Sequence, residues 1–339
     1  MGKNDGMARL RLAAGAVTGA LAMAGASGAT AADSPASPAA APKPALATII
    51  MSEQIDFTSA INGHTYRIQI AKPFAPAPKG GYPTLYVLDG DGYFGTWSSA
   101  VRMRGISQEI EPAVVVGVGY PDGDNSLMVA MSRRNYDLTQ SPPDAETAAS
   151  APGFKGKDAT ADADTFFRVL EEEIKPRVAR AIAVAPGRDI LFGHSLGGLF
   201  VLHTLYKHPD AFHTWLALSP SVWWDDRSVL KDEPAFVDWV KKTHPELKLF
   251  VAVGRLEQVP PTADALPPGY TLEKMTAMVN RSAMVDNAQG VVTRLSAIDG
   301  GPGFHVDGKV FEGKTHISVA WESVNTFLDF ALPLPKPSR

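Results

Sequence analysis

The stretch that most limits the folds open to this chain is residues 189–203, Asp-Ile-Leu-Phe-Gly-His-Ser-Leu-Gly-Gly-Leu-Phe-Val-Leu-His. Residues 190–192 form a short apolar run of the kind that a buried parallel strand needs. Gly193, Ser195 and Gly197 then fit G-x-S-x-G, a sharp strand-to-helix turn that exposes the serine hydroxyl at the top of a sheet. The two glycines let the neighbouring elements approach closely. The pattern predicts an α/β fold with Ser195 as nucleophile; the alternative is a glycine-rich turn with an ordinary N-cap serine.

The first 47 residues are typical of an export signal and a linker. A signal peptide is predicted over residues 1–31. Its start is basic, with Lys3, Arg9 and Arg11; an apolar run follows at residues 12–24, and Ala29-Thr30-Ala31 offers an A-x-A cleavage site. Residues 32–47 are rich in proline and alanine, which predicts a semi-extended linker. We therefore expect export to the periplasm or the medium with no stable membrane anchor; a retained N-terminal anchor is the alternative.

Composition excludes several classes of function. The chain has no cysteine, which removes disulfides, thiolate nucleophiles and cysteine-bound metals. Its net charge is −4 with both signs dispersed, so no nucleic-acid partner is expected. No H-E-x-x-H or clustered His/Asp set calls for a metal, and no cofactor is expected. Residues 48–334 are of a length that suits one catalytic domain.

Apolar strands alternate with helices in this domain, which predicts a mostly parallel central sheet with helices on both faces. An antiparallel pair is expected at one edge, from residues 48–58 and 65–72. Buried strands are expected at residues 84–88, 113–118, 190–192, 214–218, 248–253 and 291–298. Helices are expected at residues 96–110, 162–183 with a bend at Pro176, 199–206, 234–242, 271–288 and about 317–332, and a long loop at 132–158. Ligands of such sheets bind at the carboxyl ends of the strands.

A serine nucleophile needs a base, and the base needs an orienting group. α/β-hydrolases supply these groups in the chain order serine, acid, histidine. His316 suits the base, because it lies in a glycine-led turn just before the last helix; His305, in the preceding glycine-rich segment, is the rival. Glu257 suits the acid, because it follows the expected strand at residues 248–253. Asp264, Asp225 and Asp226 are the other candidates for the acid.

Two backbone amides are expected to hold the oxyanion of a tetrahedral intermediate. The amide of Leu196 follows the nucleophile. The second donor is expected in the loop after residues 84–88, at Gly90 or Asp91, unless this loop is a simple glycine turn. The loops that begin at Asp89 and Asp122 superficially suggest calcium sites, but neither completes the spacing with the terminal glutamate.

Several stretches together resemble the esterase-D-like branch of the α/β-hydrolases, and most closely the esterases of the catecholate siderophores enterobactin, salmochelin and bacillibactin. They are residues 82–94, 133–139, 193–198, 219–224 and 313–316, and the resemblance covers roughly residues 49–332 in consistent order. It implies hydrolysis of the ester bonds of a macrocyclic trilactone by Ser195 and His316. The partner that it implies is a small-molecule ester, with a ferric siderophore as a candidate. Glu257 matches the acid position of the family, although some relatives rely on a serine–histidine dyad.

The resemblance also implies substrate contacts. Arg134 falls where relatives place an arginine facing the anionic siderophore; a surface or salt-bridged arginine is the alternative. Trp223 and Trp224 could stack on catechol rings, unless one is a core residue. Gln140, where relatives often have proline, and an apparent insertion at residues 300–311 depart from the family pattern and bear on substrate choice. A general exported carboxylesterase for feruloyl or acetyl esters, an acyltransferase and a non-catalytic binding protein remain alternatives.

Overall fold

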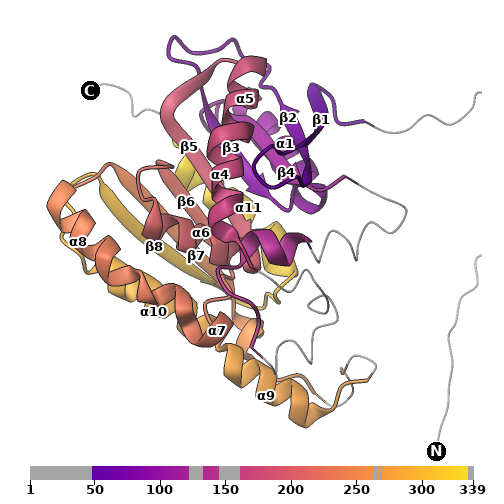
Figure 1. Ribbon diagram of the computed structural model, residues 1–339, viewed down its shortest axis with the longest axis vertical. Helices are drawn as coiled ribbons and strands as arrows, with labels where there is room; N and C mark the ends of the chain where they lie inside the picture. Colours follow the sequence, from indigo (N-terminus) through magenta and orange to yellow (C-terminus); the bar gives the residue numbers. More distant parts are fainter. Residues whose placement is uncertain are drawn as a thin grey trace, which may run out of the picture. The chain divides into compact units, whose positions relative to one another are not determined.

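An eight-stranded sheet organises the part of the chain that the computed structural model describes, namely residues 48–121, 133–144, 161–262, 264, 266 and 269–334. The strand order is β1-β2-β4-β3-β5-β6-β7-β8 (Figure 1). The strands are β1 (Ser52–Thr58), β2 (Thr65–Ala71), β3 (Tyr82–Leu88), β4 (Val114–Gly119), β5 (Val184–His194), β6 (Thr214–Leu218), β7 (Leu247–Gly254) and β8 (Phe304–Phe311). β1 pairs antiparallel with β2, and β2 with β4; every later pairing is parallel. The predicted signal peptide and linker lie outside the described residues.

Helices cover both faces of this sheet, as expected for a doubly covered parallel sheet. They are α1 (Gly90–Ile106), α4 (Ala163–Arg168), α5 (Lys175–Ala181), α6 (Leu196–Lys207), α7 (Trp224–Arg227), α8 (Glu233–Thr243), α9 (Leu272–Ser282), α10 (Met284–Ser296) and α11 (Ser318–Ala331). A further helical turn spans residues 133–138. From Thr48 onward the chain forms one unit.

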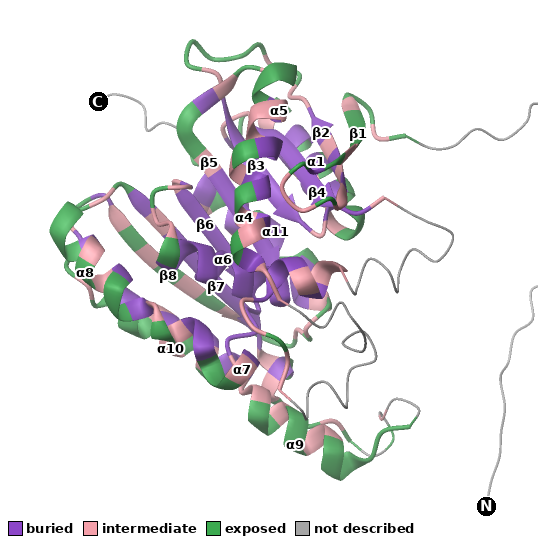
Figure 2. Cartoon of the chain, viewed as in Figure 1, coloured by how far each residue is buried: buried purple, intermediate pink, exposed green. Residues whose placement is uncertain are grey.

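The alternation of side chains along the strands divides the core into two layers. In β3, every residue is buried. Tyr86 and Leu88 join the layer under α4, α6, α8 and α10, whereas Leu85 and Val87 join the layer under α1 and α11. β3, β4 and β6 are buried along their whole length, and β5 is buried from Ile190 onward, so the middle of the sheet is purple in Figure 2. Such continuous apolar strands are what a sheet covered on both faces requires.

The prediction of a strand at residues 291–298 is wrong, because this stretch belongs largely to α10. The buried residues of α10 recur at helical spacing: Met284, Val285, Ala288, Val291 and Leu295. The last strand is β8, which was expected to be an insertion before the histidine turn. β8 lies at an edge of the sheet, and its exposed residues alternate with partly buried ones, so its glycine and charged residues hid the strand pattern.

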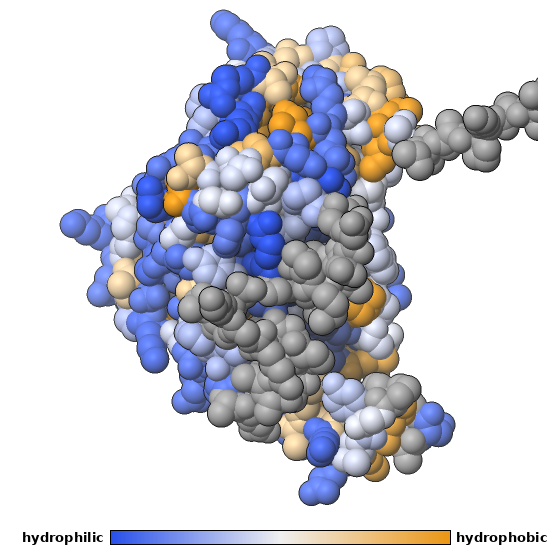
Figure 3. All heavy atoms as spheres, turned by 45° about the vertical axis from the view of Figure 1, so that its right-hand side comes forward, coloured by the Kyte–Doolittle hydropathy of each residue, from blue (hydrophilic) through white to orange (hydrophobic). Residues whose placement is uncertain are grey.

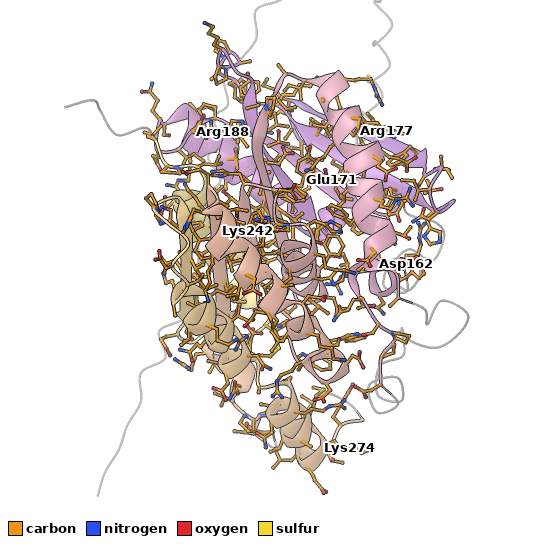
Figure 4. The ribbon with its side chains drawn as sticks, turned by 60° about the vertical axis from the view of Figure 1, so that its left-hand side comes forward. Asp162, Glu171, Arg177, Arg188, Lys242 and Lys274 are labelled. Carbon is orange, nitrogen blue, oxygen red and sulfur yellow. The ribbon has the colours of Figure 1, made fainter. Side chains whose placement is uncertain are left out.

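Two predicted helices are interrupted. The helix expected at residues 162–183 runs from α4 through a π-helical segment, Val169–Ile174, into α5, with Pro176 in the first turn of α5. Proline has no backbone N–H to donate, so a change of helical pitch before it is expected. Figure 4 shows Asp162 and Arg177 toward opposite ends of this run. The helix expected at residues 271–288 breaks at Ala283, whose φ is 39°, to give α9 and α10.

Apolar residues are scattered rather than continuous on the face of the described residues that Figure 3 shows. On the face shown in Figure 3, hydrophobic side chains form small separate patches on a mainly hydrophilic surface. Isolated exposed apolar residues of this kind are normal for a folded domain. Within the described ranges, we find no helix that combines the length and the apolar character needed to span a bilayer.

Candidate active site

Ser195 occupies the turn between the central strand β5 and helix α6. Its φ of 62° and ψ of −116° are strained for a residue other than glycine. From Ile190 to Tyr206 it is the only residue that is not buried. A Cβ on Gly193 would overlap the carbonyl oxygen of Gly197, so this glycine is required by close approach. The G-x-S-x-G stretch thus forms the predicted turn and leaves the serine accessible.

The same turn is fastened to the neighbouring strand β6. The Ser195 N–H donates to the Leu218 carbonyl at 3.0 Å, and the Ser221 N–H donates to the Ser195 carbonyl at 3.1 Å. A Cβ on Gly198 would lie 2.8 Å from the Leu218 carbonyl oxygen. The second glycine of the Gly-Gly pair therefore permits the contact between α6 and the end of β6.

His316 and Glu257 are joined by a hydrogen bond of 2.6 Å between Nδ1 and Oε2. The side chain of Glu257 is 1% exposed, whereas that of His316 is 39% exposed. The other carboxylate oxygen, Oε1, accepts hydrogen bonds from Ser219 Oγ and from the Gly254 N–H, each at 2.6 Å. Three donors therefore fix the carboxylate, and Nε2 is the ring nitrogen of His316 left to exchange a proton with a substrate or a nucleophile.

Two backbone contacts hold the loops of Glu257 and His316 together. Glu257 lies in a 3-10 turn, Arg255–Gln258, directly after β7. The Leu256 N–H donates to the Lys314 carbonyl at 2.9 Å. A Cβ on Gly254 would overlap the same carbonyl, so only glycine allows this approach. Ser219, which is fully buried and orients Glu257, was not predicted as a site residue. The signals that the sequence offers are its position after β6 and its place in the family-like stretch at residues 219–224.

His194 connects the turn of Ser195 with His316. The two imidazole centroids are 4.5 Å apart. His194 is buried, and its Nδ1 lies 2.7 Å from the Tyr93 hydroxyl. Burial lowers the pKa of His194 well below its usual value, and electrostatic interaction with the neighbouring His316 and Arg134 lowers this pKa further. A neutral imidazole at the end of β5 thus lies beside the predicted base.

The rival residues lie elsewhere. His305 is exposed in β8, where it pairs in register with Lys248 at the beginning of β7, whereas Glu257 follows the end of β7. Asp225 and Asp226 lie in α7, and Asp264 is exposed in the loop before α9. Among the candidate acids, it is Glu257 that is bonded to His316.

The two amides expected to bind an oxyanion begin the helices that follow neighbouring parallel strands. Gly90 is the first residue of α1 after β3, and Leu196 is the first residue of α6 after β5. First-turn N–H groups have no acceptor within their own helix. Each helix is preceded by a residue with positive φ, Asp89 at 53° and Ser195 at 62°. A Cβ on Gly90 would lie 2.8 Å from the backbone of Gly117, so glycine is needed there.

The residues expected to contact substrate have different surroundings. Arg134 is ion-paired: its Nε donates to Asp89 Oδ1 at 2.6 Å and its Nη2 to the His194 carbonyl at 3.1 Å. Trp224 is 1% exposed, packs in the core and donates its indole N–H to the Ser141 carbonyl at 2.9 Å. The expectation that Trp224 stacks on substrate is therefore corrected, because no ring face is open. Trp223 is half-buried and keeps part of its surface exposed.

No group of three or more His, Asp or Glu side chains suited to a metal ion occurs among the described residues.

Comparison with known sequences agrees with this arrangement. The Esterase family model matches residues 59–284. The ferri-bacillibactin esterase BesA of Bacillus subtilis is 35% identical over 288 residues, which are 84% of this chain and 91% of that protein. The siderophore triacetylfusarinine C esterase of Aspergillus fumigatus is 34% identical over 272 residues, which are 78% of this chain and 87% of that protein.

Solved structures give the same result. A protein titled BES, from Bacillus cereus, superposes with a TM-score of 0.71 at 31% identity, covering 86% of this chain and 98% of that one. The siderophore hydrolase EstB from Aspergillus nidulans also gives 0.71, at 25% identity, covering 87% and 100%. The expected fold and the resemblance to siderophore esterases are confirmed: the chain belongs to the esterase family and is a carboxylic ester hydrolase of the α/β-hydrolase fold.

Proposed function

We propose that this protein hydrolyses the ester bonds of a siderophore, with catecholate trilactones of the bacillibactin and enterobactin type as substrates. The observation that carries the proposal is the 35% identity to a ferri-bacillibactin esterase over 84% of the chain. The bonded pair of His316 and Glu257, close to the turn of Ser195, supplies the chemistry that such a substrate needs.

In the proposed mechanism, Ser195 Oγ attacks the ester carbonyl while His316 Nε2 takes its proton. The carbonyl oxygen becomes an oxyanion, which the N–H groups of Leu196 and Gly90 stabilise. His316 then protonates the leaving alkoxide, and the alcohol departs. Water repeats the sequence on the acyl-enzyme and releases the acid. Glu257 holds the proton of His316 on Nδ1, so that Nε2 is free to accept.

The test is chromatography of a tri-catecholate trilactone incubated with the protein. Linear trimer, dimer or monomer should form with the wild type and not with Ser195→Ala or His316→Ala. His305→Ala is the matched control, because His305 is an exposed histidine at the beginning of β8, and it should match the wild type. Intact trilactone with wild-type protein that still cleaves simple aryl esters would overturn the siderophore proposal in favour of a general carboxylesterase.

We also propose that the protein is exported, on the signal-like sequence of residues 1–31. The basic start, the apolar run and the A-x-A site support this proposal. N-terminal sequencing of protein recovered from the periplasm or the medium should find a chain that begins at residue 32. A full-length chain recovered from the cytoplasm would contradict it.

A further inference from the structure

The guanidinium of Arg134 bridges the two turns that end β3 and β5. Its Nε donates to Asp89 Oδ1 at 2.6 Å, and its Nη2 donates to the His194 carbonyl at 3.1 Å. Asp89 and His194 are the last residues before Gly90 and Ser195. One side chain thus connects the two segments that carry the candidate oxyanion donors, the N–H groups of Gly90 and Leu196.

Both connected turns hold unusual backbone conformations. Asp89 and Ser195 have φ values of 53° and 62°, which cost energy for residues other than glycine and persist only where the surroundings impose them. The Asp89 carboxylate also lies close to the first turn of α6, since a Cβ added to Gly197 would lie 3.5 Å from Asp89 Oδ2. A charged, two-donor bridge between the turns is a suitable constraint, because guanidinium groups are planar and fix the direction of each bond.

Arg134 is itself held by a buried anchor. It lies in the helical turn 133–138, in which Asp137 is fully buried. The Asp137 carboxylate accepts hydrogen bonds from the hydroxyls of Tyr66, at 3.1 Å, and Tyr120, at 2.9 Å. The guanidinium of Arg133 lies 5.5 and 5.3 Å from the centroids of the same two rings. Because Tyr66 belongs to β2 and Tyr120 follows β4, the turn that presents Arg134 is fixed to the sheet.

We propose that Arg134 is a positioning residue, which sets the distance between the Gly90 and Leu196 amides and thereby completes the oxyanion hole, and that it does not select the anionic substrate. This inference rests on the proposed function, since it assigns Arg134 to the same reaction. It has a direct consequence: loss of the bridge should slow every ester alike, charged or neutral, because all of them pass through the same oxyanion.

The first test compares a neutral aryl ester, p-nitrophenyl acetate, with an anionic catecholate ester, using Arg134→Lys. Lysine keeps the positive charge but cannot make both directed bonds. We expect kcat to fall about 10- to 100-fold on both esters with little change in KM, since deletion of a whole oxyanion donor costs about 100- to 1,000-fold. A loss confined to the KM of the anionic ester, with kcat on the neutral ester intact, would overturn the proposal.

The second test uses Asp89→Asn, for which the two roles of Arg134 predict opposite signs. Asparagine tolerates the left-handed backbone conformation, so the substitution removes charge without adding strain. A positioning role predicts that Asp89→Asn lowers kcat on both esters. It also predicts that the double variant with Arg134→Lys has a kcat no lower than that of the less active single variant. A substrate-binding arginine, freed from its carboxylate, would instead bind the anionic ester more tightly and lower its KM, which would refute the positioning role.

The third test measures the affinity for a trifluoromethyl ketone, which is neutral and forms an oxyanion when serine adds to it. A purely structural effect of the substitution would leave this affinity unchanged. The affinity for the ketone should fall by the same factor as kcat/KM. The matched control is Arg188→Lys, because Arg188 forms a two-bond pair with Glu111 at 2.6 and 2.7 Å. Arg188 lies in the first half of β5, whereas the nucleophile turn follows the last residue of that strand. The control should equal the wild type in both measurements. Unchanged ketone affinity in Arg134→Lys would contradict the proposal.

If Arg134→Lys folds poorly, the neutral pair Asp89→Asn with Arg134→Gln supplies the same comparison without an unpaired buried charge. A folded neutral pair with full kcat on the neutral ester would contradict the proposal, and one with reduced kcat would support it. Failure of the proposed function would be recognised by a different result, namely that Ser195→Ala retains esterase activity. If Ser195→Ala is inactive and Arg134→Lys is normal, only the positioning role fails.

Discussion

Replacement of Glu257 by glutamine probes the hydrogen bonds that set the state of His316. Oε1 of Glu257 accepts from Ser219 Oγ and from the Gly254 N–H, and a backbone N–H can only donate. The carbonyl oxygen of glutamine must therefore keep the Oε1 position, because a flipped amide would leave buried donors facing each other, at a cost of about 1–3 kcal/mol. The amide NH₂ group then faces Nδ1 of His316.

This orientation reverses the tautomer of His316. An amide N–H donating to Nδ1 requires Nδ1 to be unprotonated, which places the ring proton on Nε2. Nε2 can then no longer accept the proton of the attacking serine. The corresponding carboxylate-to-amide change in a Ser-His-Asp triad lowers kcat about 10⁴-fold, which corresponds to about 5 kcal/mol. We expect Glu257→Gln to lower kcat about 10³- to 10⁴-fold with the fold intact.

The assay is the release of nitrophenolate from p-nitrophenyl acetate, combined with ¹⁵N NMR of the His316 ring to identify its tautomer. Glu312→Gln is the matched control, because Glu312 is an exposed glutamate, paired with Arg255, close to the same histidine turn. It should retain wild-type kcat. The reasoning would be refuted if Glu257→Gln kept more than a tenth of wild-type kcat, or if its His316 still carried the proton on Nδ1; a serine–histidine dyad would then suffice.

Two further predictions concern stability. Burial raises the pKa of Asp137 to about 7, so between about pH 4 and 7 the folded state keeps a proton that the unfolded state has lost. The free energy of unfolding of the wild type should therefore fall relative to that of Asp137→Asn as pH rises across this window, by at most about 4 kcal/mol. Thermal unfolding of both proteins at several pH values measures this difference. A difference in stability that does not change with pH would contradict the prediction. Gly193→Ala should abolish activity and lower the unfolding temperature, because its Cβ would overlap Gly197, whereas Gly80→Ala, which meets open space, should do neither. An active Gly193→Ala protein would show that the turn can relax.

The sequence was most informative where a backbone requirement and a chemical requirement coincide. The turn around Ser195 needs glycine at fixed positions and an apolar strand before it, so the motif indicates both the local fold and the nucleophile. Glu257 could be predicted because it follows the buried apolar run of β7, and His316 because it precedes the clear helix α11. Position at the carboxyl ends of parallel strands brings such residues together, although they are far apart in the chain.

The residues that the sequence did not reveal act through contacts without a local pattern. Ser219 is one serine among many, and only the folded chain brings it to the carboxylate of Glu257. The pairing of Arg134 with Asp89 joins positions 45 residues apart. Strand β8 escaped prediction because an edge strand needs apolar residues on one face only, and the β-branched residues at the centre of α10 resembled a strand more closely.

The most direct measurement of the central claim is mass spectrometry of the protein quenched with acid during turnover of a tri-catecholate trilactone. We predict a covalent acyl adduct on the peptide that contains Ser195, with the adduct and the turnover both absent from Ser195→Ala. Turnover of the trilactone by Ser195→Ala, or an adduct located on another residue, would contradict the assignment of Ser195 as the nucleophile of a siderophore esterase.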